Sequence, residues 1–317
     1  MKIVVLEPLG VTPENLENIT LPLKKRGHQI TFYSTRSQTA REQISRAQEA
    51  DVLVIANQPL KKEVLQACPQ LKLISVAFTG VDHVDTSYAQ SRGISVCNAA
   101  GYSTHAAAEL AISLALALLR HGAKADRAVR AGQDKSGLLG RELYGKTFAI
   151  VGTGAIGGHT AQLAKAFGCR VIACSRTPRP RLIRQGVTYM PLNQLLQEAD
   201  ILSLHVPLTP ETKNLIGEKE LALMKPSALL INTARGPLVD QNALRLALQN
   251  RRLAGAGIDV FDQEPPLPPA YPLLNTPNTM LTPHIGFYTQ EALAQRAQIV
   301  FENILKWEDK TPQNQIV

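Results

Sequence analysis

The chain has 317 residues, a length that favours two domains of ordinary size. Its composition, 44% hydrophobic and 19% charged, excludes a disordered or collagen-like chain. Its charge is unusual: 34 Lys and Arg against 26 Asp and Glu give +8, which raises nucleic acid, an acidic membrane surface or an anionic ligand as candidate partners.

Short β-branched segments alternate with helical patterns along the chain. In the first hundred residues the expected strands are 3–6, 30–33, 52–55, 73–77 and 94–97. An apolar helix is expected over 104–119, and a second series of strands follows at 147–151, 170–174, 201–205, 228–232, 255–259 and 279–282. This alternation predicts an α/β protein with two doubly wound parallel sheets, the second having the six strands of a full dinucleotide-binding sheet.

About 35 residues remain after the second series, too few to fold unaided. The pattern over Thr289–Trp307 predicts one amphipathic helix with Thr289 as its N-cap. We expect this helix to pack on the first domain, which then becomes discontinuous. The predicted domains are 1–99 with 286–317, and 100–285.

The cysteines and the hydropathy of the chain indicate in which cellular compartment the protein resides. There is no Cys-x-x-Cys pair, and we expect buried thiols in a reducing compartment at Cys68, Cys97, Cys169 and Cys174. The apolar run at 3–6 is too short for a signal peptide, and the helix at 104–119 falls short of the ~20 residues of a membrane span. We therefore expect a cytosolic protein without membrane contact. We also expect no metal, since no site has the required spacing around His83, His105 or His159.

A glycine-rich loop follows the expected strand at 147–151 and opens a helical pattern. Its sequence is Gly152-Thr153-Gly154-Ala155-Ile156-Gly157, which matches Gly-x-Gly-x-x-Gly in a strand–turn–helix context. The first glycine permits a tight turn, the second lets the backbone approach a pyrophosphate, and the third allows close helix packing. The helix N-terminus favours the phosphate charge. The loop predicts a dinucleotide site, with a purely structural glycine turn as the alternative.

The end of the second strand, about 20 residues further on, selects between NAD and NADP. A carboxylate there would bind the ribose 2′-hydroxyl of NAD, but the chain has Ser175, Arg176 and Thr177. These side chains can hydrogen-bond a 2′-phosphate and supply positive charge, so we predict a preference for NADP(H) over NAD(H). The alternative is an NAD enzyme in which Arg176 stacks on adenine.

Three polar residues follow the expected strands four, five and six of the second series: Arg235, Glu264 and His284. They can converge, because the carboxyl ends of parallel strands line one crevice. Arg235 can hold a substrate carboxylate and polarise its keto group, while His284 donates a proton and Glu264 orients it and favours its charged form. The set predicts reduction of a 2-keto acid. Each residue alone also fits a structural role, as a salt bridge, a solvated acid or a packed imidazole.

With these motifs the chain resembles the D-isomer-specific 2-hydroxyacid dehydrogenases over nearly its whole length. The resemblance is carried by Thr79–Asp85, Gly101–Thr104 with Ala108-Glu109, Gly152–Gly157, His205–Thr209, Asn232–Gly236, Asp259–Pro265 and Pro283–Gly286. It implies a Rossmann cofactor domain, a flavodoxin-like substrate domain and a homodimer that pairs through the cofactor domain.

The resemblance also implies site residues. The catalytic set is Arg235, Glu264 and His284, and the substrate contacts are Arg235, His284, the backbone at Phe78, Thr79 and Gly80, and Tyr288. The aromatic pair Phe287-Tyr288 replaces small residues of many members and is expected to affect substrate size. Besides the phosphate loop and Ser175–Thr177, the implied cofactor contacts are Thr104, His205, Val206, Pro207, Thr212, Thr233, Ala234, Arg235, Asp259, His284 and Gly286.

The predicted activity is NAD(P)H-dependent reduction of a 2-keto acid of the glyoxylate, hydroxypyruvate or pyruvate class to the D-2-hydroxy acid. The residues after the second strand are similar to those of NADP-dependent glyoxylate/hydroxypyruvate reductases. Two alternatives stay open: a dinucleotide-responsive co-regulator with little turnover, and an enzyme similar to D-lactate dehydrogenases that uses NADH. A formate-type dehydrogenase fits less well, because that branch has Gln where this chain keeps Glu264.

The positive charge is concentrated in one stretch. No Asp or Glu lies between Leu143 and Gln197, and this stretch contains seven basic residues: Lys146, Lys165, Arg170, Arg176, Arg179, Arg181 and Arg184. It also contains the phosphate loop and the position expected for a 2′-phosphate. A polyanionic cofactor therefore accounts for the charge, and we expect no nucleic-acid partner.

Overall fold

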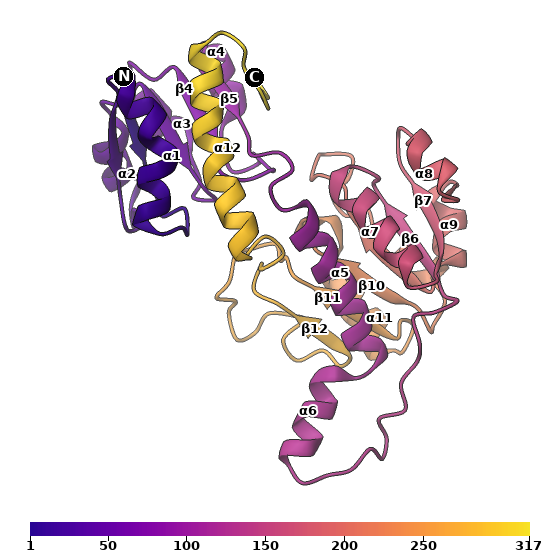
Figure 1. Cartoon of the computed structure of the whole chain (residues 1–317). Helices are drawn as coiled ribbons and strands as arrows, with labels where there is room; N and C mark the ends of the chain where they lie inside the picture. Colours follow the sequence, from indigo (N-terminus) through magenta and orange to yellow (C-terminus); the bar gives the residue numbers. More distant parts are fainter. The chain divides into compact units, whose positions relative to one another are not determined.

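The computed structural model describes all 317 residues and divides into two compact units (Figure 1). Unit 1 comprises Met1–Tyr102 and Tyr288–Val317, and unit 2 comprises Ser103–Phe287. Both ends of the chain therefore belong to unit 1.

Unit 1 is built on a parallel five-stranded sheet with the order β2-β1-β3-β4-β5. Its strands are β1 (Lys2–Val5), β2 (Gln29–Phe32), β3 (Val52–Ile55), β4 (Leu73–Val76) and β5 (Ser95–Cys97). All five lie within one residue of their predicted bounds. The order is that of flavodoxin-like sheets, which confirms the predicted fold class of this unit. The chain end adds a short antiparallel pairing, in which Ile316 N–H donates to the Val96 carbonyl at 2.7 Å.

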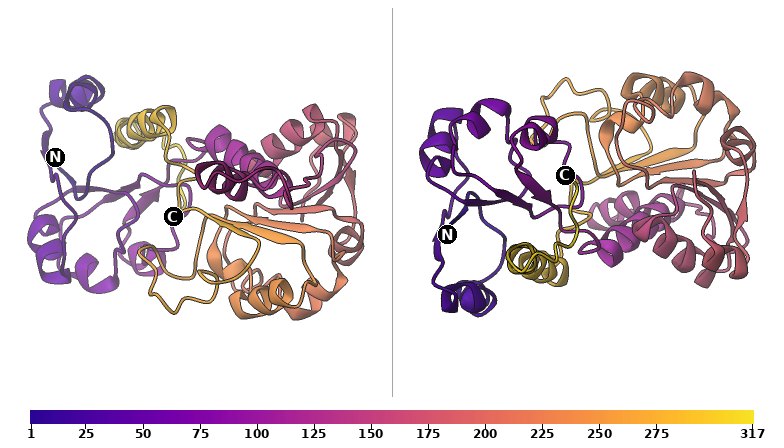
Figure 2. Two further views of the ribbon diagram at one scale, coloured as in Figure 1. Left: turned by 90° about the horizontal axis from the view of Figure 1, so that it is seen from below. Right: turned by 90° about the horizontal axis from the view of Figure 1, so that it is seen from above.

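Helices cover both faces of this sheet. They are α1 (Pro13–Lys25), α2 (Ala40–Ala47), α3 (Lys62–Gln66), α4 (Thr86–Ser91) and α12 (Gln290–Glu308). Helices α1 and α12 lie side by side on one face, and α2, α3 and α4 lie on the other (Figures 1 and 2). The expected C-terminal helix is present, and Thr289 caps it by accepting a hydrogen bond from Ala292 N–H at 3.2 Å.

Unit 2 is built on a parallel seven-stranded sheet with the order β12-β11-β10-β9-β6-β7-β8. Its strands are β6 (Thr147–Val151), β7 (Arg170–Cys174), β8 (Thr188–Tyr189), β9 (Ile201–Leu204), β10 (Leu229–Asn232), β11 (Gly255–Ile258) and β12 (Thr279–Leu281). The order is that of a dinucleotide-binding sheet with one further strand, so the predicted Rossmann class is confirmed.

The expected count of six strands in this sheet was wrong. The missing strand is β8, which has only two residues and is too short to show an alternating pattern. Because β8 is the third strand of the unit in chain order, Arg235, Glu264 and His284 follow its fifth, sixth and seventh strands rather than its fourth, fifth and sixth. The sheet reverses its strand order between β6 and β9, where ligands bind in such folds.

The helices of unit 2 also form two layers around its sheet (Figure 2). They are α5 (Thr104–Leu119), α6 (Gly122–Arg130), α7 (Ala155–Ala166), α8 (Pro180–Arg184), α9 (Leu192–Glu198), α10 (Glu218–Leu223) and α11 (Gln241–Gln249). Helices α5 and α7 pack on one face, and α9, α10 and α11 pack on the other. No single helix is long and apolar enough to span a membrane; α5 and α6 meet that test only as a pair bent by 57°.

Candidate active site

The parallel strands of unit 2 bring distant parts of the chain to one edge of the sheet. The loops after β6, β7, β9, β10, β11 and β12 all leave the sheet at its carboxyl edge. Except for Thr104, which begins α5, every cofactor or catalytic residue predicted in this unit lies on one of these loops or at the start of α7. The cofactor and catalytic residues that the sequence motifs predicted one by one thus lie together at one edge of the unit 2 sheet.

The phosphate loop shows why its three glycines differ. Gly152 has φ +92°, and a Cβ there would lie 2.6 Å from the His205 carbonyl oxygen. A Cβ on Gly157 would lie 1.9 Å from the carbonyl oxygen of Gly152. In contrast, a Cβ on Gly154 would meet no atom within 4 Å, and this residue is the N-cap of α7. The loop is therefore tight on the protein side and open at the helix N-terminus, where an anion binds favourably.

We expect Gly157→Ala to disrupt the phosphate loop, because the added methyl group overlaps the Gly152 carbonyl. The thermal midpoint of unfolding should fall, as overpacking of this kind costs about 1–3 kcal/mol or more. Gly158→Ala is the matched control, since the nearest atom to its Cβ is 3.8 Å away. Calorimetry and NADPH titration compare the two variants; equal effects would contradict the assignment.

The missed strand β8 supports the phosphate loop. Tyr189 donates a hydrogen bond from its hydroxyl to Thr153 Oγ1 at 3.0 Å and accepts one from Arg179 N–H at 3.0 Å. Beside the loop is a cavity of about 410 Å³, whose lining includes Thr104, Gly154, Ala155, His159, Arg179 and Arg181. Two arginines of the basic stretch thus line this cavity.

The residues after β7 are accessible. Ser175 is half-buried, and Arg176 and Thr177 are exposed. A carboxylate that was not among the predicted site residues, Glu211, acts on this region. The pKa of Glu211 is lowered mainly by a hydrogen bond from the Thr209 side chain and also by the positive charge of Arg176. Arg176 therefore has an acidic neighbour within electrostatic reach, which would oppose a bound 2′-phosphate.

His205 lies beneath the phosphate loop as a neutral imidazole. Burial lowers its pKa to about 4, and its Nε2 lies 2.9 Å from the hydroxyl oxygen of Ser203. Thr212 holds the segment after His205 in a turn: its hydroxyl donates to the Pro207 carbonyl at 2.7 Å and accepts from Thr209 N–H at 2.8 Å. These two hydrogen bonds fix the backbone next to Val206 and Pro207.

We expect His205 to make unit 2 sensitive to acid. The unfolded imidazole, with a pKa of 6.5, takes up a proton that the folded state excludes down to about pH 4. The unfolded state thus binds more protons in this window, so stability is lost as the pH falls from 6.5 to 4, by about 3 kcal/mol at most. Thermal unfolding of the wild type and His205→Gln at pH 7 and pH 4.5 measures this. The variant should lose less stability, and an equal loss would contradict the prediction.

The turn after β10 is held by Asn232, which is buried. Its Nδ2 donates to the Arg235 carbonyl at 2.8 Å, and its Oδ1 accepts from Ala234 N–H at 3.1 Å. Within this turn the Thr233 hydroxyl is buried and has no hydrogen-bond partner. A buried hydroxyl without a partner is rare and indicates an absent ligand or water. The turn therefore fits a bound dinucleotide.

Glu264 and His284 form a hydrogen-bonded pair at this edge. His284 Nδ1 lies 2.8 Å from one carboxylate oxygen of Glu264 and 3.1 Å from the other, so the ring donates from Nδ1 and directs Nε2 away from the pair. Phe287 packs edge-on against the imidazole, with ring centres 5.5 Å apart. Arg235 lies on the loop after β10 and is half-buried, with Nη1 donating to the Ala234 carbonyl at 2.8 Å.

Asp259 fixes the backbone that carries His284. His284 has φ +56°, a left-handed conformation that is uncommon outside glycine. The buried Asp259 carboxylate accepts from the N–H groups of Ile285 and Gly286, both at 2.8 Å, and from the Thr282 hydroxyl. Its carbonyl also accepts from His284 N–H at 2.8 Å. These bonds offset the strain and hold the imidazole in place.

The predicted substrate residues Phe78, Thr79 and Gly80 belong to unit 1, at the carboxyl end of β4. The Phe78 carbonyl accepts from Ala99 N–H at 3.0 Å, and the Thr79 carbonyl accepts from Asn98 Nδ2 at 2.6 Å. The N–H groups of Thr79 and Gly80 have no acceptor within the chain. Tyr288 also belongs to unit 1 and is 64% exposed, whereas its neighbour Phe287 belongs to unit 2.

The structure contains no group of three or more His, Cys, Asp or Glu side chains that could hold a metal ion. Two of the histidines set aside in the sequence analysis contact each other, with His105 Nδ1 lying 3.0 Å from His159 Nε2.

Comparison with known proteins adds to this geometry. The family model described as D-isomer specific 2-hydroxyacid dehydrogenase, NAD binding domain, matches residues 112–286. A glyoxylate reductase from Korarchaeum cryptofilum is 42% identical over 269 residues, which cover 83% of this chain and 81% of that protein.

Solved structures resemble the whole chain. An acyclic imino acid reductase in complex with NADPH and D-Arg has a TM-score of 0.91 at 29% identity and covers 100% of both chains. A D-lactate dehydrogenase from Aquifex aeolicus, complexed with NAD and lactic acid, has a TM-score of 0.85 at 29% identity and covers 98% of this chain and 96% of that one. Similar structures thus bind either nicotinamide dinucleotide.

Proposed function

Since the chain belongs to the D-isomer-specific 2-hydroxyacid dehydrogenase family, we propose that it reduces a small 2-keto acid, of the glyoxylate, hydroxypyruvate or pyruvate class, to the D-2-hydroxy acid with NADPH. The observation that carries the proposal is the Glu264–His284 pair, held by Asp259 at the carboxyl edge of a dinucleotide-binding sheet. Its similarity to glyoxylate reductases supports the substrate class.

The catalytic roles follow from the chemistry of three side chains. Arg235 binds the substrate carboxylate and polarises the keto oxygen. His284 protonates that oxygen as it becomes an alkoxide, and Glu264 keeps the proton-donating nitrogen aimed at it. The nicotinamide cofactor, when bound, supplies the hydride. In unit 1, the N–H groups of Thr79 and Gly80 hold the substrate carboxylate, because they are donors without an acceptor within the chain.

The residues present fit a dinucleotide cofactor. The open backbone at Gly154 and the start of α7 would hold the pyrophosphate, and the Thr233 hydroxyl would gain a partner. Ser175, Arg176 and Thr177 would bind the 2′-phosphate, which is the basis for the proposed preference for NADP. The remaining proposed contacts are Thr104, Ile156, His205, Val206, Pro207, Thr212, Ala234, Asp259 and Gly286.

A steady-state screen tests this function. Oxidation of NADPH is followed at 340 nm with glyoxylate, hydroxypyruvate, pyruvate and longer 2-keto acids, and chiral analysis identifies the product. We expect turnover on at least one of the short acids and a D-hydroxy acid as product. NADPH binding without turnover on any of them would replace the enzyme with a dinucleotide-responsive binding protein, and an L-product would contradict the assigned chemistry.

We also propose a homodimer that pairs through unit 2. Helix α6 and the chain after it extend away from the body of this unit (Figure 1) and expose large apolar side chains: Val129 at 74%, Leu139 at 93% and Tyr144 at 75%. Apolar side chains gathered on one projecting segment are typical of a protein interface. A second copy of the chain suits such a surface, because most soluble oligomers are symmetric.

Leu139→Asp should shift the protein from dimer to monomer, because it places a charge in the proposed contact. Light scattering coupled to size exclusion measures the mass. Leu246→Asp is the control, since Leu246 is 48% exposed on α11 of the same unit. A wild type that is monomeric at micromolar concentration would remove the dimer from the proposal.

A cytosolic location is a further part of the proposal. All four cysteines are free, as expected of a protein in a reducing compartment. Burial raises the pKa of Cys68, Cys97 and Cys169 to about 11, so these thiols are protonated and unreactive at neutral pH.

A further inference from the structure

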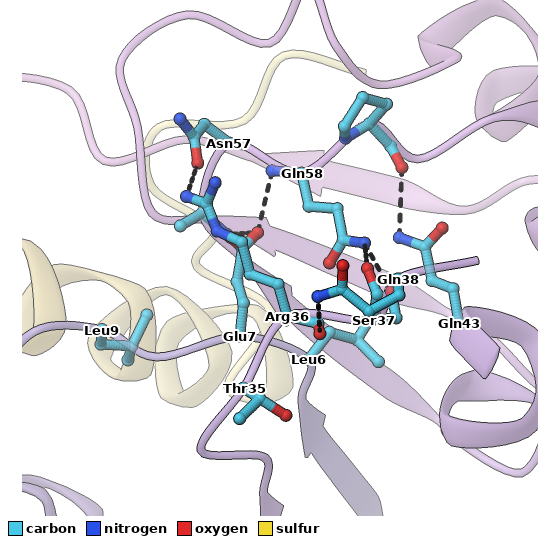
Figure 3. A network of polar contacts seen from close by, with 12 residues as sticks. Leu6, Glu7, Leu9, Thr35, Arg36, Ser37, Gln38, Gln43, Asn57 and Gln58 are labelled. Carbon is cyan, nitrogen blue, oxygen red and sulfur yellow. Dashed lines mark hydrogen bonds and ion pairs between the residues drawn. The ribbon is translucent and has the colours of Figure 1, made fainter. Parts of the chain in front are cut away.

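The carboxyl edge of the unit 1 sheet carries a charged network that the proposed reaction does not use. Glu7 follows β1, and its side chain is fully buried. Its Oε1 accepts a hydrogen bond from the backbone N–H group of Gln58 at 3.0 Å (Figure 3). It also accepts one from Ala56 N–H at 2.7 Å, and both donors lie just after β3. Its Oε2 lies 3.0 Å from Nε of Arg36, on the loop after β2.

Arg36 is held in place yet accessible. Besides the ion pair with Glu7, its Nη2 donates to the Asn57 side chain, so one guanidinium spans the ends of β1 and β3. Its side chain nonetheless remains 55% exposed. A cation that is both fixed and exposed, at the edge where parallel sheets bind ligands, is suited to an anionic group.

The loop that carries Arg36 is tied down on both sides. Before it, the Thr35 carbonyl accepts a hydrogen bond from Arg46. After it, the Ser37 carbonyl accepts from Gln58 Nε2 at 2.8 Å (Figure 3). In addition, Gln38 N–H donates to Glu42 at 2.7 Å. The loop is therefore ordered without a ligand, and this lowers the entropic cost of binding one.

A second guanidinium acts on the same region. Arg296 of α12 is buried, donates to the Leu9 carbonyl at 2.8 Å and lies 5.2 Å from the ring centre of Phe78. Burial lowers its pKa, and interactions with Tyr102 and with the Glu7 carboxylate partly oppose that shift. Arg296 thus places a second, buried guanidinium next to Phe78, the residue that precedes Thr79 and Gly80.

We propose that Arg36 is a specificity-determining residue that binds a second anionic group, a carboxylate or a phosphate, at the far end of the keto acid. The inference rests on the proposed function, in which the first carboxylate binds at Thr79 and Gly80. These residues follow β4, and Asn57, which Arg36 contacts, follows the adjacent strand β3. Neighbouring strands lie about 5 Å apart, and the Arg36 guanidinium lies between the ends of β1 and β3. It is therefore one to two strand spacings, about 5–10 Å, from the end of β4, a span that a keto acid with an acidic tail can bridge.

The test compares four keto acids with NADPH: glyoxylate, 2-oxovalerate with a neutral tail, 2-oxoglutarate with a carboxylate tail, and 3-phosphooxypyruvate with a phosphate tail. In the wild type, kcat/KM for at least one acidic tail should exceed that for 2-oxovalerate by about tenfold or more. Arg36→Gln should lower that value by about 10- to 100-fold, mainly through KM, because a charge-assisted contact is lost. Glyoxylate and 2-oxovalerate should change less than twofold.

Controls separate the inference from folding and from the proposed function. Arg41→Gln removes an exposed arginine of α2 and should change none of the four substrates. Arg36→Lys keeps the positive charge but lacks the guanidinium group, and it should retain part of the preference for acidic-tailed substrates. This variant provides a second test if Arg36→Gln does not fold. An equal loss on all four substrates, or a wild type that prefers the neutral tail or accepts only glyoxylate, would overturn the inference alone. A wild type that reduces none of these acids, nor hydroxypyruvate and pyruvate, overturns the proposed function as well.

Discussion

His284→Asn lowers kcat for keto acid reduction by about 10²- to 10⁴-fold, the usual contribution of a general acid, and leaves NADPH affinity within about threefold. The reason is that Nε2 of His284 is the proposed proton donor, while the proposed cofactor contacts are spread over several other loops. Asparagine is the better replacement, because His284 has φ +56° and Asn tolerates this conformation more readily than Ala. Single-turnover kinetics measure the chemical step, and NADPH fluorescence measures binding.

His284→Ala and Glu264→Gln complete the series. The Ala variant removes the imidazole at a strained position, so its thermal midpoint should fall further than that of the Asn variant. The Gln variant keeps an acceptor for His284 Nδ1 but removes the charge, so its kcat should lie between the wild type and His284→Asn. A kcat retained in both His284 variants would take this residue out of the mechanism, whatever the behaviour of Glu264.

Arg176→Gln should lower kcat/KM for NADPH by about 10- to 100-fold while leaving kcat/KM for NADH within about twofold. The predicted loss is that of a charge-assisted contact with the 2′-phosphate, which NADH lacks. The matched control is Arg170→Gln. It belongs to the same basic stretch but begins β7, at the opposite end of that strand, where it pairs with Glu198 at 2.6 Å. The control should use both cofactors as the wild type does.

Glu211→Gln gives a result of opposite sign. Because its carboxylate acts on Arg176, its removal should increase kcat/KM for NADPH and leave NADH unchanged. If the wild type used NADH as well as NADPH, or if Arg176→Gln weakened both cofactors equally, the basic residues after β7 would not select for the 2′-phosphate.

Local patterns were sufficient to predict the regular structure. All eleven predicted strands are present, and their bounds differ from the structure by no more than one residue, because most of them lie in segments rich in apolar or β-branched residues. The glycines of the phosphate loop were interpretable because the motif follows a strand and opens a helix. Strand β8 was not predicted, because its two residues are too few to show a periodic pattern. For the same reason the hydrogen bond from Tyr189 to Thr153 was not expected.

The net charge of +8 also shows what a sequence can and cannot predict. Its concentration between Leu143 and Gln197 was evident from residue counting alone. Glu211 lies outside this stretch, yet the fold brings it within electrostatic range of Arg176, whose positive charge lowers the pKa of Glu211. Residue counting cannot reveal such proximity.

The sequence by itself determined the α/β class, the dinucleotide loop and the set Arg235, Glu264 and His284, because strand periodicity and the rule that parallel strands end at one edge are local properties. Only the tertiary structure decided how those residues are held: the left-handed backbone of His284, its support by Asp259, and the clamp of Arg36 by the buried Glu7. Each of these depends on side chains 20 or more positions apart, whose partners are selected by packing and by the preference of buried polar groups for hydrogen-bond partners.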